Sequence, residues 1–215
     1  MKILALDFSS PLRSVAVTDG SQDVSEMVET GSQGMQAFGM IEAALRQAKL
    51  EREQIECIVV GLGPGSYTGI RSALSIAQGW QLGRGLKLLG ISSVEAIANE
   101  AQAEKIHGKV NIIVDAQRRE LYLATYQISA KECVEAKPLH IIARSEISNN
   151  ASETEIFVGP EVTHWFPSGK TLFPRAAMLA RLAKTRADFI AGEKFEPIYL
   201  RETTFVKAPP LRIIS

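Results

Sequence analysis

The chain contains one glycine-rich segment, Gly61–Arg71 (GLGPGSYTGIR), of the kind whose backbone amides can hold a phosphate group. It lies between an apolar run and a helical pattern, but its spacing fails both standard tests for a nucleotide loop. A Walker A loop requires Gly-Lys-Ser/Thr, and no lysine lies between Glu56 and Arg84. A G-x-G-x-x-G pattern meets Ser66 or Thr68 where its last glycine should stand. The segment therefore matches no known nucleotide cradle, and we interpret it as a shaped turn.

Two aspartates stand at the ends of similar apolar runs, Asp7 after ILAL and Asp115 after NIIV. If two lobes face each other across a cleft, such a pair can position a metal–phosphate complex, with turn amides holding the phosphates. Neither following turn contains a glycine, and Pro11 removes an amide donor from the first. Both turns are therefore poor for wrapping a triphosphate, and we favour a purely structural role for Asp7 as a turn acid. The predicted degenerate phosphate-turn positions are Asp7, Ser9, Ser10 and Asp115.

Other catalytic patterns are missing from the sequence. The three histidines are isolated, without H-x-x-x-H spacing, which excludes a zinc or iron site built on a helix. Proline and glycine occupy the positions before Ser66 where a G-x-S-x-G elbow needs its nucleophile. Cys57 lies in an apolar run, far in sequence from Cys133, which argues against a disulfide. We therefore predict no catalytic residue, no metal and no cofactor.

The composition is that of a globular protein: 215 residues, 46% of them hydrophobic, with 24 Lys and Arg balanced by 24 Asp and Glu. The zero formal net charge excludes a polybasic protein that binds nucleic acid by charge alone. The length suits one large domain or two small ones. No stretch has the length of a signal peptide's apolar region or of a membrane span, so we expect a cytoplasmic protein without membrane contact.

The elements that must position these residues repeat along the chain. A strand, an acid, a polar turn and an alternating strand occur at Lys2–Thr18 and again at Val110–Gln127. With Asp7 set on Asp115, Val15 falls opposite Leu123. A duplication predicts two related lobes, residues 1–106 and 107–215, although any two β-hairpins share such a pattern. The other predicted elements include strands at Asp23–Glu29 and Glu56–Gly61 and helices at Gly34–Lys49, Thr68–Leu82 and Pro174 to about Ala191.

The predicted helix Thr68–Leu82 carries an apolar stripe of Ile70, Ala73, Leu74, Ala77 and Trp80. Ala73 and Ala77 leave a flat surface on which another helix could cross closely. Ordinary core of this chain is the favoured interpretation of the stripe, and a docking face for another protein is the alternative. If it is a docking face, Ala73→Arg or Ala77→Arg is expected to leave the chain folded and to abolish pairing with a partner.

Several segments together resemble one protein family: the opening ILALDFSS with SVAV, the loop and helix GLGPGSYTGIRSALSIAQG, the segment DAQRRELYLATY and the tail PIYLR. They occur in the order found in the TsaB (YeaZ) family and extend over nearly the whole chain. The GPGSYTGIR part is the most specific of them. The resemblance implies an α/β fold with two lobes of the actin-like ATPase type (ASKHA, ribonuclease H-like), each built on a mixed sheet.

The resemblance to the TsaB family also implies a function. Such proteins are non-catalytic partners of TsaD, the paralogue that transfers threonylcarbamoyl to the adenosine next to the anticodon of certain tRNAs. They pair with TsaD, or with themselves when alone, through their first two helices; the ATPase TsaE joins the complex, and tRNA is contacted only indirectly. The residues that the resemblance assigns to partner binding are Met35, Phe38, Tyr67, Thr68, Ile70, Arg71, Ala73, Leu74 and Ala77.

The chain departs from the family pattern in places. It has no histidine in Gly31–Gln36, where many relatives have one, and Gln117 stands where relatives have arginine. The chain is also short after Glu132. An independent phosphotransferase of the same fold is the alternative function, and a peptidase is less favoured because the sequence lacks a nucleophile or metal constellation.

Overall fold

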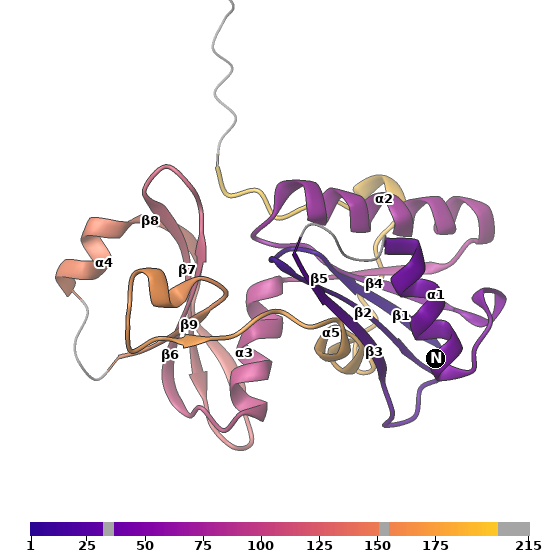
Figure 1. The fold of residues 1–215 in the computed structure, drawn as a ribbon, viewed down its shortest axis with the longest axis horizontal. Helices are drawn as coiled ribbons and strands as arrows, with labels where there is room; N and C mark the ends of the chain where they lie inside the picture. Colours follow the sequence, from indigo (N-terminus) through magenta and orange to yellow (C-terminus); the bar gives the residue numbers. More distant parts are fainter. Residues whose placement is uncertain (32–36, 151–154, 202–215) are drawn as a thin grey trace, which may run out of the picture.

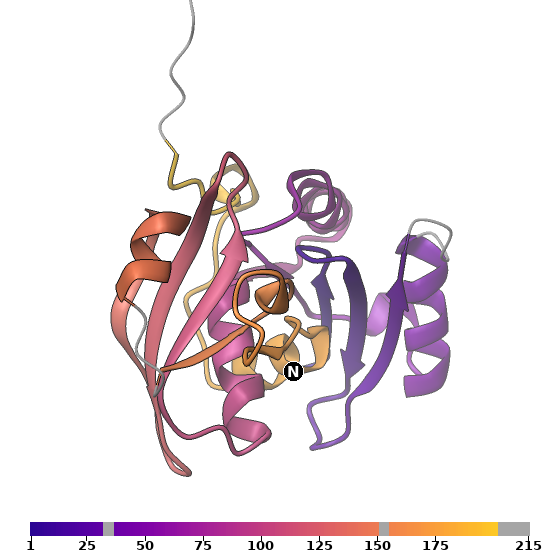
Figure 2. The same ribbon diagram turned by 60° about the vertical axis from the view of Figure 1, so that its left-hand side comes forward.

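The computed structural model describes residues 1–31, 37–150 and 155–201 and places them in two mixed sheets with helices packed around them (Figure 1 and Figure 2). The first sheet contains β1 (Ile3–Asp7), β2 (Leu12–Thr18), β3 (Ser25–Thr30), β4 (Cys57–Gly61) and β5 (Lys87–Ile91). The second contains β6 (Gly108–Asp115), β7 (Glu120–Ile128), β8 (Cys133–Ala143), β9 (Ile156–Gly159) and β10 (Lys170–Thr171). The α-helices are α1 (Ala37–Ala48), α2 (Tyr67–Arg84), α3 (Ser93–Ala103), α4 (Arg144–Asn150) and α5 (Ala176–Ala183). Short 3₁₀ turns are η1 (Arg52–Gln54), η2 (Val162–His164) and η3 (Gly192–Lys194).

The two sheets share one topology. The strand order is β3-β2-β1-β4-β5 in the first sheet and β8-β7-β6-β9-β10 in the second. In each sheet the first three strands of the chain pair antiparallel, and the last two add in parallel. Asp7 ends β1 and Asp115 ends β6, so the two acids occupy equivalent positions. The repeat in the sequence is therefore a structural duplication, which confirms the predicted two-lobed α/β fold.

The register of the second hairpin differs from the simple alignment. Six residues separate the paired Asp7 and Ser14, whereas five separate Asp115 from its partner Leu121. Val15 is therefore level with Tyr122, and its predicted alignment with Leu123 is wrong by one position. A shift of one residue moves a side chain to the other face of a sheet, so the two hairpins present different residues to their neighbours.

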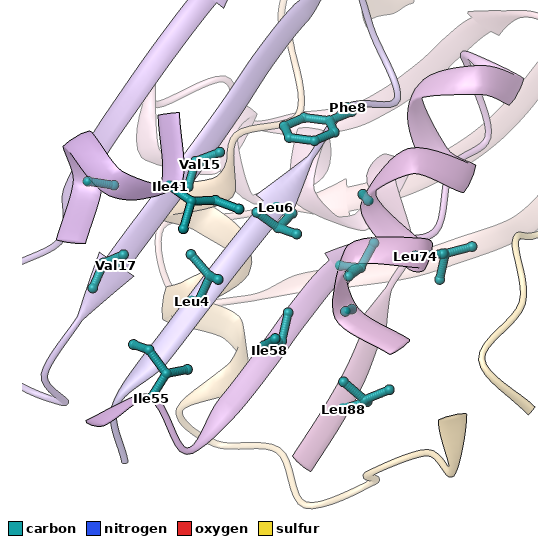
Figure 3. Close-up of a cluster of buried hydrophobic side chains, with 14 of the residues drawn as sticks. Leu4, Leu6, Phe8, Val15, Val17, Ile41, Ile55, Ile58, Leu74 and Leu88 are labelled. Carbon is teal, nitrogen blue, oxygen red and sulfur yellow. The ribbon is translucent and has the colours of Figure 1, made fainter. Parts of the chain in front are cut away.

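Buried apolar side chains on both faces of the first sheet hold the helices in place. Helices α1 and α2 cover one face, where Leu4 and Ile58 lie in one cluster with Leu74 of α2 (Figure 3). Helix α5 covers the other face, in a cluster that includes Ile3. Helix α3 lies between the sheets, with Ile97 packed on the second. Because both faces are covered, β1 and β4 are almost continuously apolar.

Side chains of the first sheet bind the N-terminus of α5, although this helix follows the second sheet in the chain. Ser14 Oγ accepts a hydrogen bond from Ala176 N at 2.8 Å. Glu26 Oε1 accepts from Ala177 N at 3.0 Å, and Arg175 donates to both oxygens of Glu26 at 3.2 and 2.6 Å. These bonds satisfy amides that a helix start leaves without intrahelical partners.

The chain thus crosses back to the first sheet after β10. Helix α5 ends at Ala183, so the predicted continuation to about Ala191 is wrong. The segment beyond it still packs on the first sheet, where Ile190 N donates to Leu88 O at 2.9 Å. The division into lobes 1–106 and 107–215 remains a prediction. The structure shows in addition that the chain after β10 returns to the first sheet.

Ser14→Ala is expected to lower the free energy of unfolding by about 1–2 kcal/mol, because it leaves Ala176 N at the start of α5 without its buried acceptor. Chemical denaturation of the purified protein measures the change. Ser75→Ala, at an exposed position of α2, is the matched control and should stay within about 0.5 kcal/mol of the wild type. Equal losses in the two variants would show that Ser14 does not hold α5.

Candidate functional site

A cleft of about 990 Å³ lies between the lobes, where β1 and β6 end. Its walls come from residues 8–11, 64–70, 114–117 and 197–199, together with Glu161 and a few neighbours. Of the predicted phosphate-turn positions, Ser9, Ser10 and Asp115 line this cleft and Asp7 does not. The structure therefore brings the two predicted turns to one site from opposite lobes.

Asp7 is fully buried, and both oxygens of its carboxylate accept hydrogen bonds from other groups of the chain. Its Oδ1 accepts hydrogen bonds from the amide and the hydroxyl of Ser9 at 2.9 and 2.7 Å, and its Oδ2 accepts from Ser93 Oγ at 3.0 Å. Desolvation by burial raises the pKa of Asp7 above its ordinary value of 3.8, while the bonds from Ser9 and Ser93 act in the opposite direction. Asp7 joins the first turn to the start of α3, as a structural turn acid does.

The raised pKa of Asp7 gives a testable pH dependence. The folded chain holds this proton more tightly than the unfolded chain, so Asp7 stabilises the fold fully below about pH 3.8 and loses this contribution as the pH rises through the folded pKa. Asp7→Asn removes the titration. We expect the stability of the variant relative to the wild type to increase from about pH 4 to about pH 7 in chemical denaturation series.

Asp19→Asn is the control for this series. Hydrogen bonds from Ser21 lower the pKa of the exposed Asp19, so its contribution is present at neutral pH and lost as the pH falls. Its variant should therefore differ from the wild type in the opposite sense. Stability curves of Asp7→Asn that run parallel to those of the wild type would contradict the assignment.

The glycines of the loop after β4 allow it to pack directly on the first turn. Ser66 N donates to Ser9 O at 2.7 Å. A Cβ atom on Gly65 would lie 2.0 Å from Ser9 O, and one on Gly69 would lie 1.9 Å from Phe8 O. These distances leave no room for a side chain, so the glycine-rich composition is required by this close contact between two segments of the same chain.

Asp115 likewise forms its interactions with other groups of the chain, in and around the second turn. Its Oδ1 accepts from Gln117 N at 2.9 Å and forms an ion pair with Arg144 at 3.0 Å. The three residues that follow Ala116 have left-handed φ angles of 61°, 54° and 64°, a conformation that costs a non-glycine residue about 1–2 kcal/mol. The bonds made by Asp115 help to hold this turn.

Glu161 faces the cleft although no sequence pattern singles it out. Burial raises the pKa of its carboxyl, and the neighbouring charge of Asp115 raises it further. It follows β9, which reaches this position only because β9 pairs with β6. That long-range pairing has no local signal in the sequence.

The apolar stripe of α2 belongs to the chain's own core. Ala73 and Ala77 are fully buried, and Ile70 and Leu74 are each 4% exposed, all in the cluster beneath α1 and α2. The structure thus contradicts a docking face on Ala73 and Ala77, and their burial leads us to expect that arginine at either position disrupts the fold. These four residues point to the sheet because the apolar side of a helix packs on the nearest apolar surface.

The opposite side of α2, with the start of α1, forms an exposed surface that we call the outer face. Phe38 and Tyr67 are 56% and 57% exposed, and Leu82 is 87% exposed. A shallow groove between the two helices is lined by Ala37, Phe38, Tyr67, Thr68, Arg71, Ser72, Ser75 and Ile76. Small exposed residues recur along α2 at Thr68, Ser72, Ser75 and Gly79, next to the exposed Arg71.

Four of the predicted partner-binding residues lie on this outer face: Phe38, Tyr67, Thr68 and Arg71. Met35 falls outside the described residues. Ser72, Ser75, Gly79 and Leu82 lie on the same exposed side of α2 and were not predicted from the sequence. Their spacing of three and four residues after Thr68 was the available signal, but small and polar residues on a helix usually mean only a solvated surface.

Within residues 1–31, 37–150 and 155–201, no group of three or more His, Cys, Asp or Glu side chains is placed to hold a metal ion. In the same ranges, no helix is long and apolar enough to cross a membrane. Helix α2 is the longest of the described helices. Ser66 caps its start, where Ser66 Oγ accepts from Gly69 N at 3.3 Å, and the left-handed Gly85 follows its last residue.

Known proteins match both the sequence and the fold. The model of the family TsaD, tRNA N6-adenosine threonylcarbamoyltransferase, matches residues 35–196. The tRNA threonylcarbamoyladenosine biosynthesis protein TsaB of Escherichia coli (strain K12) is 26% identical to this chain, over 98% of this chain and 99% of its own length. The protein of the same name from Bacillus subtilis (strain 168) is 27% identical over 59% of this chain and 56% of its own length.

Two solved structures from Pseudomonas aeruginosa show the same fold. YeaZ superimposes with a TM-score of 0.78 at 23% identity, and a protein described as similar to peptidase YeaZ does so with a TM-score of 0.80 at 24% identity. Each match covers 93% of this chain and 99% of the other. The family match, which spans most of the chain, and these relatives together show that the chain belongs to the tRNA N6-adenosine threonylcarbamoyltransferase (TsaD) family, in its TsaB (YeaZ) group.

Proposed function

We propose that this chain is a non-catalytic subunit in the biosynthesis of threonylcarbamoyladenosine in tRNA, and that it pairs with a TsaD-type paralogue through the outer face of α1 and α2. The names of the matched relatives support a role in the biosynthesis of threonylcarbamoyladenosine in tRNA. One observation supports the outer face as the pairing surface: large exposed apolar side chains border a row of small residues on the 18-residue helix α2. A TsaE-type ATPase is the third component of the proposed complex, and tRNA is held mainly by the partners.

The outer face has the composition of a helix–helix interface. Small side chains at Thr68, Ser72, Ser75 and Gly79 allow a second helix to approach the backbone of α2 closely. Phe38 and Tyr67 are aromatic and exposed at the groove, and such residues supply much of the energy of protein interfaces. Contact with a partner would remove their apolar surface from water, at roughly 25 cal/mol per Å² of area buried.

A TsaD-type protein suits this surface because the chain itself matches the TsaD family over residues 35–196. A paralogue with the same fold carries an equivalent pair of helices. Two such pairs can pack around an approximate two-fold axis, in which each protein uses the same patch. The same geometry allows two copies of this chain to pair when the paralogue is absent.

The hydrogen bonds that fix the first turn and the glycine-rich loop support a non-catalytic role. Both oxygens of Asp7 already accept hydrogen bonds from the chain, and Ser66 N is bound to Ser9 O. In an independent phosphotransferase, these are groups that would be needed for a metal–phosphate complex. Calorimetry of the isolated chain with ATP and magnesium should therefore give no saturable heat at millimolar nucleotide. Tight binding would instead favour the phosphotransferase.

Reconstitution tests the role in the pathway. Purified TsaD-type and TsaE-type proteins of the same organism, with threonylcarbamoyl donor and unmodified tRNA, should modify the tRNA only when this chain is added. Modification at the same rate without the chain would exclude the proposed function.

A further inference from the structure

Residues 197–201 follow η3, border the cleft and contact both lobes (the yellow segment at the upper side of Figure 1). On the first lobe, Ile198 N donates to Leu62 O at 3.0 Å. On the second lobe, the guanidinium of Arg201 donates to Ala116 O at 3.0 Å and forms an ion pair with Glu120. A segment of five residues is thus fixed at one end to the loop after β4 and at the other to the turn between β6 and β7.

The middle of this segment contacts the start of α2. Arg71 Nε donates to the hydroxyl of Tyr199 at 3.1 Å. The guanidinium of Arg71 lies 4.2 Å from the centre of the Tyr67 ring, and the rings of Tyr67 and Tyr199 are 6.4 Å apart. Tyr67 and Arg71 also line the groove of the outer face. One cluster of three side chains therefore belongs both to the segment at the cleft and to the proposed partner surface.

We propose that residues 197–201 form a strap that fixes the angle between the two lobes, and that occupancy of the outer face is transmitted to this angle through Arg71 and Tyr199. The first part concerns the chain alone, whereas the second rests on the proposed function. The strap acts at the cleft, whereas the buried contacts that join the lobes run through α3, with Ala96 in the cluster of the first sheet and Ile97 in that of the second. Because its two ends are bound to different lobes, release of either end removes a restraint on their separation.

The first part is tested on the isolated chain by double electron–electron resonance between spin labels at Glu53 and Lys137, which are exposed in different lobes. Cys133→Ser in all proteins prevents labelling at that site, and Cys57 is buried. The wild-type chain should give one narrow distance distribution, and Arg201→Ala should at least double its width. Glu120→Gln, a milder change at the same ion pair, should broaden it in the same way.

Lys109→Ala is the matched control, because it removes an ion pair with Glu155 that lies within the second lobe. It should leave the distribution unchanged. Wild-type distributions in both Arg201→Ala and Glu120→Gln would overturn the strap, as would equal broadening in Lys109→Ala.

The second part adds the TsaD-type protein to the same samples. The partner should shift or narrow the wild-type distribution, whereas Tyr199→Phe, which keeps the ring but lacks the oxygen that binds Arg71, should bind without this response. If the partner binds and Tyr199→Phe responds like the wild type, the transmission is overturned. If the partner does not bind at all, the proposed function fails, while the distributions of the isolated chain still decide whether the strap exists.

Discussion

Ala73→Arg is expected to unfold the chain, whereas Ser75→Arg, two positions further along α2, is expected to leave it folded. Ala73 is fully buried in the cluster between α2 and the first sheet. Arginine there both overfills the core and buries a charge without a partner, which we expect to cost more than about 4 kcal/mol, most of the stability of a typical domain. Ser75 is exposed, so arginine at this position remains in water.

Circular dichroism during heating and chemical denaturation distinguishes the two variants. Ser75→Arg should melt close to the wild type, within about 0.5 kcal/mol in the free energy of unfolding. Ala73→Arg should show no cooperative transition at all. A cooperative Ala73→Arg that melts at the wild-type temperature would mean that Ala73 faces solvent and that the assignment of the two sides of α2 is reversed.

Gly69→Ala and Gly79→Ala are expected to change stability in opposite directions, although both glycines lie in α2. A Cβ atom on Gly69 would lie 1.9 Å from Phe8 O, a backbone atom that moves only if the whole first turn moves. We expect a loss of about 3 kcal/mol. A Cβ atom on Gly79 meets nothing within 4 Å, so the better helix propensity of alanine should add about 0.5–1 kcal/mol.

Urea denaturation of the two variants measures both changes against the wild type. The pair isolates the contact with the first turn, because the substitution and the helix are the same. Losses of equal size would show that the glycine-rich loop does not need its glycines for packing on residues 8–11. Phosphate binding would then again be a possible reason for the glycines of this loop.

Much of the fold could be predicted because local patterns determine it. The apolar runs that end in Asp7 and Asp115 each form the central strand of a sheet, and the hairpins that follow them pair as their alternation indicates. The second hairpin is nevertheless shifted by one position, since its turn is one residue shorter than the first. Aligning the two hairpins by the positions of Asp7 and Asp115 alone does not account for the different lengths of their turns.

The site was harder to predict because its groups come from distant parts of the chain. Ser93 reaches Asp7, and Tyr199 reaches Arg71, through contacts that no local pattern specifies. Helix α2 shows a second difficulty. A stripe of Ile70, Ala73, Leu74 and Ala77 predicts a buried side, but it does not tell whether the surface that buries it is the chain's own sheet or another protein.

The family resemblance correctly pointed to the TsaB group. The resemblance implied that partners bind to the first two helices. The burial of each side chain then divides the predicted partner-binding residues on these helices into two groups. The exposed group is Phe38, Tyr67, Thr68 and Arg71, and the group in the core is Ile70, Ala73, Leu74 and Ala77. The outer face, including Ser72, Ser75 and Gly79, is thus the surface on which the proposed pairing depends.

The affinity of the TsaD-type protein for surface variants of this chain tests that dependence most directly. Isothermal titration calorimetry should compare the wild type, Ser75→Arg on the outer face, and Ala136→Arg on the exposed β8 of the other lobe. We predict that Ser75→Arg weakens binding by about 100-fold or more and that Ala136→Arg changes it by less than about two-fold. Wild-type affinity in a folded Ser75→Arg, or a loss confined to Ala136→Arg, would contradict the assignment of the outer face as the partner surface.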